Sequence, residues 1–216
     1  STAASAVNAD LSAGTAQFAN GGTDTLSSIE NLIGSNANDT LTGSDGDNTL
    51  TGGLGDDTLV GNDGDDVLEG GAGNDTLDGG AGDDTLNAGD GSDVIDAGEG
   101  SDIVDAGAGD DTVLAGAGDD TLAGSDGTDT LDLSEATSGA TVDLSAGTAS
   151  STETGNDTIS GFENVAGGAG ADTITGSDGA NVISGNAGDD VLDGGAGNDT
   201  VAGGEGDDTV MAGAGD

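Results

Sequence analysis

Aliphatic residues recur every nine positions along much of this 216-residue chain. In a nine-residue frame that begins at Gly34, the eighth place is aliphatic in every repeat up to Asp132. The eighth places of this first block are Leu41, Leu50, Leu59, Leu68, Leu77, Leu86, Ile95, Val104, Val113, Leu122 and Leu131. A second block keeps the frame from Gly167 to Met211, with eighth places Ile174, Ile183, Leu192, Val201 and Val210. Acidic disordered tails keep no such phase, so the pattern predicts a folded repeat structure.

The sixth place of the frame is Asp in every repeat except those of Asn48 and Asn181. The sixth-place aspartates are Asp39, Asp57, Asp66, Asp75, Asp84, Asp93, Asp102, Asp111, Asp120, Asp129, Asp172, Asp190, Asp199 and Asp208. Glycine dominates the first, second and fourth places, as in "GGAGNDTLD" at 70–78. The frame therefore combines one apolar position with one carboxylate and a glycine-rich segment.

This pattern predicts short strands rather than helices. A helix needs apolar spacings of three and four, and each interior glycine costs about 1 kcal/mol. The tripeptide around the eighth place reads as a very short strand, with its neighbours pointing outward, and "GGAGND" reads as a turn. Two repeats make one coil of 18 residues, and coils stack in parallel about 4.8 Å apart. We therefore expect an all-β, parallel β-roll with two thin sheets and aliphatic ladders inside.

The chain divides into four segments on this frame. We expect a cap or inter-block segment at 1–33, a first roll of eleven repeats at 34–132, an insertion at 133–166, and a second roll at 167–216 with five repeats and a truncated sixth. The insertion is related to the first segment by a shift of 133 residues, because "DLSAGTA" stands at 10–16 and again at 143–149. We read the chain as an excerpt of a tandem array, in which Phe18, Ile29, Leu32 and Phe162 cap or fill the ends of the rolls.

The charge and composition of the chain limit the functions that it can have. There are 44 Asp and Glu against no Lys or Arg, a formal net charge of −44, and there is no His, Cys, Trp or Tyr. Most catalytic side chains are therefore missing, and we expect no enzyme. So acidic a chain repels nucleic acid and anionic lipid, and no apolar run approaches the roughly 20 residues of a membrane span. We expect neither nucleic-acid binding nor membrane insertion.

The sixth-place aspartates are the candidate metal ligands. Residues eighteen apart, such as Asp57 and Asp75, should lie one above the other at the same edge, where two carboxylates repel unless a cation lies between them. Carboxylates and glycine carbonyls suit Ca²⁺ rather than Zn²⁺ or Mg²⁺. Counting such same-side neighbours gives about twelve calcium sites. The small aliphatic core predicts that calcium binding and folding are one event.

Repeats such as "GGLGDDTLV" at 52–60, "GGAGNDTLD" at 70–78 and "GGAGNDTVA" at 194–202 resemble the RTX nonapeptide family. The resemblance implies calcium between adjacent same-side turns, type I secretion, and folding outside the cell. Several repeats depart from the pattern, and we expect weak or no calcium binding there. The departures are Ala88, Ala97, Ala106 and Ala115 at the first place, Ser92 and Ser101 at the fifth, and Asn48 and Asn181 at the sixth.

Two functions fit these features. The first is a calcium-binding structural module of a secreted bacterial surface or extracellular-matrix protein, such as a surface layer, a fibre or an adhesin stalk. The alternative is the secretion and folding segment of a secreted enzyme or toxin; ice binding by the partial threonine ladder is a distant third. Outward acids either bridge copies through calcium or form a solvated face. These acids are Glu69, Asp78, Asp83, Asp96, Asp105 and Asp110.

Overall fold

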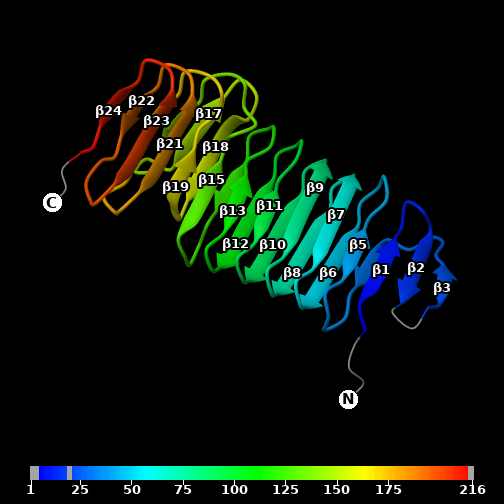
Figure 1. Ribbon diagram of the computed structural model, residues 1–216. Helices are drawn as coiled ribbons and strands as arrows, with labels where there is room; N and C mark the ends of the chain where they lie inside the picture. Colours follow the sequence, from blue (N-terminus) through cyan, green and yellow to red (C-terminus); the bar gives the residue numbers. More distant parts are fainter. Residues whose placement is uncertain (1–4, 19–20, 214–216) are drawn as a thin grey trace.

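The computed structural model describes residues 5–18 and 21–213 and contains only β-structure among them. Twenty-four strands form two twelve-stranded sheets that face each other along one elongated stack (Figure 1). The chain alternates between the sheets, so that each pair of repeats completes one coil. No helix in the described part of the chain has the length and apolar character of a membrane span. The predicted all-β, parallel β-roll is confirmed.

The first sheet runs in the order β23 (Thr200–Glu205), β21 (Val182–Ala187), β19 (Phe162–Ala166), β15 (Asp129–Asp132), β13 (Thr112–Leu114), β11 (Val94–Asp96), β9 (Thr76–Ala81), β7 (Thr58–Asp63), β5 (Thr40–Thr42), β1 (Val7–Asp10), β2 (Thr15–Phe18) and β3 (Thr23–Thr25). The second sheet runs in the order β24 (Thr209–Met211), β22 (Val191–Asp193), β20 (Thr173–Thr175), β16 (Thr141–Asp143), β17 (Thr148–Ser151), β18 (Gly155–Ser160), β14 (Thr121–Ala123), β12 (Ile103–Ala108), β10 (Thr85–Asp90), β8 (Val67–Ala72), β6 (Thr49–Leu54) and β4 (Asn31–Ile33).

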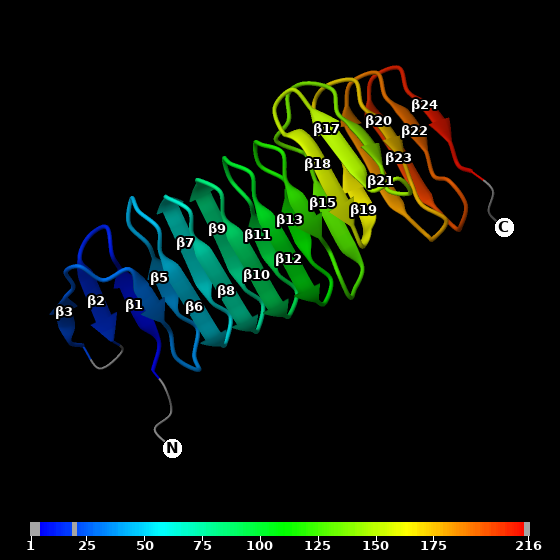
Figure 2. The same ribbon diagram turned by 180° about the vertical axis from the view of Figure 1, so that it is seen from behind.

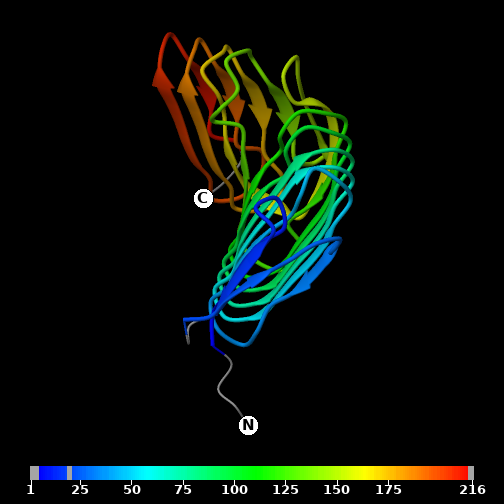
Figure 3. The same cartoon turned by 90° about the vertical axis from the view of Figure 1, so that its right-hand side faces the viewer.

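The register of the sheets follows the 18-residue coil. Leu59 pairs with Leu77 in the first sheet, and Leu68 pairs with Leu86 in the second. The eighth places of the first block are all buried, and they form two aliphatic ladders between the sheets. Seen nearly along the stack, the two sheets enclose this narrow core on both sides (Figure 3).

Several strands are longer than the sequence predicted. β11 keeps three residues, but β6 and β8 continue through the first three places of the next repeat, where Gly53 pairs with Gly71. The prediction that the whole of "GGAGND" is a turn is therefore wrong. The first place points inward like the eighth, which preserves the alternation of a strand. The chain bends after the first place, and Gly71 adopts a φ of 115° there, which glycine allows.

The insertion adds strands unequally to the two sheets. β16, β17 and β18 enter the second sheet, with antiparallel pairing of β16 to β17 and of β17 to β18, whereas β19 alone enters the first sheet. The segment before the first block does the reverse, because β1, β2 and β3 enter the first sheet and β4 the second. The second block, yellow to red, is displaced from the axis of the first (Figure 3).

The residues expected to cap or fill the ends of the rolls behave differently from one another. Phe162 is buried and Leu32 is partly buried against the core, as expected. Phe18 and Ile29 are 38% and 42% exposed, so the expectation is wrong for them in the isolated chain. Phe162 lies between two blocks, whereas Ile29 lies at the end of the stack.

Candidate metal centres

The sixth-place carboxylates form a buried ladder along both edges of the roll. The main-chain N–H of Asp57 donates to Oδ1 of Asp75 at 2.7 Å, and the N–H of Asp75 donates to Oδ1 of Asp93 at 2.7 Å. The opposite edge repeats the arrangement from Asp66 to Asp84. One oxygen of each carboxylate thus joins two adjacent coils. The stacking that the sequence predicted for residues eighteen apart is present.

The second oxygen of most of these carboxylates has no donor. In the described part of the chain, twelve Oδ2 atoms are buried and accept no hydrogen bond. They belong to Asp57, Asp66, Asp75, Asp84, Asp93, Asp102, Asp111, Asp120, Asp129, Asp157, Asp190 and Asp199. A buried, ionised oxygen without a partner costs several kcal/mol or takes up a proton. A cation would supply the partner that these oxygens lack.

First-place glycines keep space open beside these oxygens. A Cβ added to Gly70 would lie 2.6 Å from Oδ2 of Asp75 and 2.5 Å from the carbonyl oxygen of Ala88 in the next coil. The same space at Gly124 faces Oδ2 of Asp129 at 2.8 Å. Carboxylate and carbonyl oxygens therefore converge where a side chain is missing, and oxygen ligands of this kind are those that Ca²⁺ takes.

Carbonyl groups must supply much of any coordination shell. No three carboxylates converge on one point anywhere in the described residues. The chain has no His or Cys, so Zn²⁺ and other metals that prefer nitrogen or sulfur find no ligands. The donor set fits calcium, which would supply the positive charge that the buried oxygens lack.

Burial raises the pKa of the sixth-place carboxyls in the middle of the first block. Desolvation is the largest cause, nearby carboxylates add to it, and the hydrogen bond from a main-chain N–H opposes it. The pKa of Asp102 rises to about 7. The pKa rises to about 6 at Asp66, Asp75, Asp84, Asp93, Asp120 and Asp129. Without a cation, these aspartates therefore take up protons at a higher pH than aspartates that are exposed to water.

The first aspartate of each block is paired differently. Oδ1 of Asp39 accepts the N–H of Val7 and its Oδ2 accepts the N–H of Ser35. In Asp172, Oδ1 accepts the N–H of Ala140 and Oδ2 that of Gly168. Both oxygens are thus satisfied by the main chain, and neither carboxylate leaves a buried oxygen without a donor.

Each sixth-place asparagine accepts a hydrogen bond from a serine in its own turn. Oδ1 of Asn48 accepts the N–H of Ser44 at 2.5 Å, and Oδ1 of Asn181 accepts the N–H of Ser177 at 2.8 Å. Nδ2 of Asn181 donates to the carbonyl oxygen of Glu163 at 2.6 Å. These turns are completed by hydrogen bonds, so neither amide leaves a buried oxygen without a donor.

At the C-terminal end of the stack, the predicted ligands are less enclosed. Asp190 is buried, whereas Asp199 and Asp208 are partly exposed in the last coils. Oδ1 of Asp208 still accepts the N–H of Asp190 at 3.0 Å, so the ladder reaches the last complete repeat.

Asp157 is a candidate ligand that the nonapeptide frame missed. It lies in the insertion, is buried, and accepts the N–H of Asp120 with Oδ1, while its Oδ2 has no donor. Burial is the main cause that raises its pKa to about 7. The signal was present in the sequence, because "NDTIS" at 156–160 reproduces places five to nine of a repeat.

The outward acids are engaged in several ways. Fifth-place residues form a second ladder that runs in the opposite sense: the N–H of Ser101 donates to Oδ1 of Asp83, and the N–H of Thr128 donates to Oδ1 of Asp110. Oδ1 of Asp105 accepts the hydroxyl of Ser125. Glu69 accepts the hydroxyl of Thr51, and burial raises the pKa of Asp78 and Asp96.

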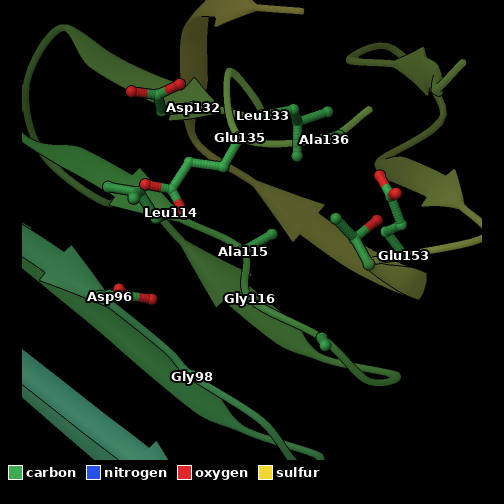
Figure 4. A pocket seen from close by; sticks show the side chains of 12 residues that line it. Asp96, Gly98, Leu114, Ala115, Gly116, Asp132, Leu133, Glu135, Ala136 and Glu153 are labelled. Carbon is green, nitrogen blue, oxygen red and sulfur yellow. The ribbon is translucent and has the colours of Figure 1, made fainter. Parts of the chain in front are cut away.

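A hollow of about 290 Å³ lies where the insertion meets the first block. Asp96, Leu114 and Glu135 line it, and Figure 4 shows Glu135 extending from the insertion toward Leu114, with Glu153 on the opposite side. Oε1 and Oε2 of Glu153 accept the hydroxyl and N–H of Thr137, so this side chain fixes the adjoining loop. The charged groups that line the hollow are all carboxylates.

The stacked coils and their rows of buried carboxylates define a cation-binding β-solenoid. The model of the RTX calcium-binding nonapeptide repeat (4 copies) matches residues 27–59, 60–95, 96–131, 166–201 and 184–216, which is more than half of the chain. The chain therefore belongs to the RTX calcium-binding nonapeptide-repeat family, and the resemblance seen in its sequence is confirmed. A search of curated proteins found no match.

Proposed function

We propose that this chain is a structural module of a secreted bacterial protein, at the cell surface or in the extracellular matrix, which calcium folds into a stiff roll. The observation that carries the proposal is the set of twelve buried carboxylate oxygens without donors along the two edges of the roll. Repeats of this family are typical of secreted bacterial proteins. A stiff rod fits a part of a surface layer, a fibre or an adhesin stalk.

Calcium binding and folding are coupled through the charges of the carboxylates. The chain has no Lys or Arg, so no side chain neutralises 44 acidic groups. The unfolded chain keeps these charges hydrated and apart, whereas the roll stacks them in rows. Calcium stabilises only the state that brings its ligands together, and binding therefore shifts the equilibrium toward the roll.

The sites of the proposal are not equivalent. We assign calcium to turns with an unpaired Oδ2 and a first-place glycine, as at Asp75 and Asp84. In the repeat of Asp93 the buried methyl group of Ala88 occupies the first place, and we expect weaker binding there. Asp39 and Asp172 bind least, because main-chain N–H groups already satisfy both oxygens. About twelve sites remains our proposal for the whole chain.

The four segments at 1–33, 34–132, 133–166 and 167–216 serve one continuous roll in this proposal. β18 pairs with β14, and β19 pairs with β15, so the stack is not interrupted at the insertion. Continuity of this kind favours a load-bearing rod over a carrier segment for an enzyme. Several of the outward acids already accept hydrogen bonds from main-chain or hydroxyl groups, which favours a solvated face over calcium bridges between copies.

A calcium titration tests the proposal. We expect far-ultraviolet circular dichroism to gain β-structure and X-ray scattering to show an expanded coil contracting to a rod as Ca²⁺ rises to about 10 mM, the range of weak extracellular calcium modules. The same concentrations of Mg²⁺ should not fold the chain. No contraction with calcium, or an equal response to magnesium, would overturn the proposal.

A pair of matched variants locates the effect. Asp75→Asn with Asp93→Asn removes two buried carboxylates, and Asp78→Asn with Asp96→Asn removes two outward carboxylates from neighbouring strands. Both pairs change the net charge equally. We expect the first pair to raise the calcium concentration at the folding midpoint several-fold. The second pair should raise this concentration much less. Equal shifts would mean that general charge neutralisation folds the chain.

A further inference from the structure

The first coil of each block differs from the coils that follow it. Carboxylate oxygens without donors begin only at the second coil, where Oδ2 of Asp57 and Oδ2 of Asp190 are buried and accept no hydrogen bond. The sixth places of the two first coils all accept main-chain N–H groups, and they are Asp39, Asn48, Asp172 and Asn181. The boundary between satisfied and unsatisfied side chains therefore falls at the same place in both blocks.

Hydrogen bonds from the protein complete the first coil of the second block, residues 167–184. Both oxygens of Asp172 accept main-chain N–H groups, and the Asn181 amide both accepts and donates. Nδ2 of Asn186 donates to the carbonyl oxygen of Gly167 at 2.6 Å, so a side chain also holds a first-place carbonyl. A buried polar group with a partner escapes the cost of several kcal/mol that an unpaired ionised oxygen carries. This coil therefore has partners for its sixth-place side chains without a cation.

The insertion packs on this coil through ordinary strand pairing. β16 pairs in parallel with β20, which places Val142 opposite Ile174, and β19 pairs in parallel with β21, which places Val165 opposite Ile183. All four side chains are buried. Figure 2 shows the insertion strands β17 and β18, in yellow, between the green strands of the first block and the orange to red strands of the second. The insertion and the first coil thus share an apolar core.

The strands of the insertion are joined by local contacts. β16 and β17 form an antiparallel hairpin, in whose turn Oδ1 of Asp143 accepts the hydroxyl of Ser145 at 2.7 Å and the N–H of Ala146 at 2.9 Å. β17 then pairs with β18. Hairpins close short loops, which costs less conformational entropy than pairing strands a whole coil apart. Asp10 holds the corresponding turn before the first block.

This part of the chain also brings less charge together than the rolls do. Residues 133–184 carry seven acidic residues in 52 positions, whereas residues 52–132 carry 23 in 81. Both sixth-place amides, Asn48 and Asn181, lie in first coils. Repulsion between carboxylates opposes the folding of the rolls, and it is weaker where fewer carboxylates are stacked.

Asp157 is an exception that belongs to the neighbouring joint. Among the described residues of the insertion, its Oδ2 alone is buried without a donor. Its Oδ1 accepts the N–H of Asp120, so the carboxylate lies against the last coils of the first block. When that block is unfolded, water reaches this carboxylate, and the unpaired oxygen no longer opposes folding of the insertion.

We propose that residues 133–184 form a calcium-independent nucleus, to which further coils are added as calcium binds. The unit pairs its own sixth-place side chains, buries its own apolar core and stacks few charges. Strands β1 to β5 and the first coil at 34–51 form a second nucleus of the same kind. The inference rests on the proposed function, because it separates the part of the chain that calcium folds from a part that folds without calcium.

A nucleus of this kind also sets the register of the roll. The repeats are so similar that a strand can pair one coil out of step and still bury its aliphatic residue. The bond from Nδ2 of Asn181 to the carbonyl of Glu163 and the bond from the N–H of Ala140 to Asp172 occur in one register only. Coils that are added to the nucleus therefore inherit its register.

Hydrogen exchange of the complete chain tests the proposal, first in chelator and then in saturating calcium. The amide of Thr173 donates to the carbonyl of Ala140 at 2.8 Å within the nucleus, and the amide of Thr76 donates to the carbonyl of Asp57 at 2.9 Å within the first block. In chelator we expect amides such as that of Thr173 to exchange at least about tenfold more slowly than in an unfolded peptide. Amides such as that of Thr76 should exchange at the unfolded rate, and calcium should protect both.

A matched pair of variants tests the hydrogen bonds that complete the first coil. Asn181→Asp replaces the amide that donates to Glu163 by a carboxylate, whereas Asn198→Asp makes the same change at an exposed fifth place. Both variants add one negative charge. We expect Asn181→Asp to lose the protection of residues 133–184 in chelator and to regain it in calcium. Asn198→Asp should behave like the wild type.

The outcomes separate this inference from the proposed function. A wild type that exchanges at the unfolded rate throughout in chelator, yet is protected in calcium, would overturn the inference and leave the proposed function standing. Protection of residues 133–184 in chelator, with no gain at 52–132 in calcium, would support the nucleus and overturn the proposed function. Equal losses in the two variants would overturn the role of the Asn181 hydrogen bonds in the nucleus.

Discussion

The main-chain N–H of Asp120 donates a hydrogen bond of 3.2 Å to Oδ1 of Asp157, 37 residues further along the chain. Within the regular repeats, the same bond joins residues 18 apart, as from Asp57 to Asp75. The insertion therefore returns the chain to the edge of the roll and supplies a carboxylate where the next repeat would have had one. The row of buried oxygens therefore extends one place beyond the first block, and it begins again in the second block at Asp172, whose Oδ1 accepts the N–H of Ala140.

This relationship predicts that Asp157 binds calcium although it lies outside the nonapeptide blocks. Asp157→Asn should remove a cation site and weaken the attachment of β18 to β14, because a buried carboxylate with an unpaired Oδ2 becomes a neutral amide. Asp178→Asn, at an exposed position of a turn, is the matched control. Isothermal titration calorimetry of both variants should show a lower calcium stoichiometry for Asp157→Asn only; equal stoichiometries would contradict the assignment.

The space beside the buried oxygens predicts a steric test. Gly70→Ala would place a methyl group 2.6 Å from Oδ2 of Asp75 and 2.5 Å from the carbonyl of Ala88, so atoms must shift and the ligands separate. We expect the calcium-loaded roll to lose about 1 to 3 kcal/mol of stability. Gly46→Ala is the control, since a Cβ there meets no atom within 4 Å. Urea unfolding in saturating calcium should separate the two variants, and a neutral Gly70→Ala would show that the space is not needed.

The raised pKa values predict an unusual pH dependence for the metal-free chain. The pKa of Asp102 is about 7 in the roll, against about 3.9 for an aspartate in an unfolded chain. Between these values the roll holds protons that the unfolded chain releases, so the free energy of unfolding falls as the pH rises from about 4 to about 7. Without calcium, β-structure should therefore increase on acidification to pH 4. Circular dichroism of a metal-free sample measures it, and a spectrum that does not change over this window would contradict the prediction.

The repeat frame predicted the regular part of the fold because a nine-residue period is compatible with one arrangement of strands and turns. One inward aliphatic residue for each strand, with glycines between strands, fixes the 18-residue coil. It could not predict the extension of β6 through Gly53, since glycine has no side chain to reveal which way a position points. The inward direction of the first place becomes visible only where an alanine such as Ala88 is buried.

The candidate site was predicted in part for a similar reason. The frame identified every regular sixth-place Asp, but it treated Asp39 and Asp75 as equivalent. Their difference depends on Val7, in the segment before the first block, and on Ser35, in the turn of Asp39 itself, because the N–H groups of both residues donate to Asp39. Asp157 was missed because its repeat is incomplete at the first places, although its last five residues fit.

The unequal insertions act as wedges. Between the two blocks the second sheet gains three strands and the first sheet gains one, a difference of about 10 Å at a strand spacing near 4.8 Å. Before the first block the excess lies in the first sheet instead. Each wedge tilts the roll toward its shorter side, and successive wedges tilt it in opposite senses. The bend between the two blocks is therefore a compliant point, so that tension along the roll opens the bend before it pulls any strand from its sheet.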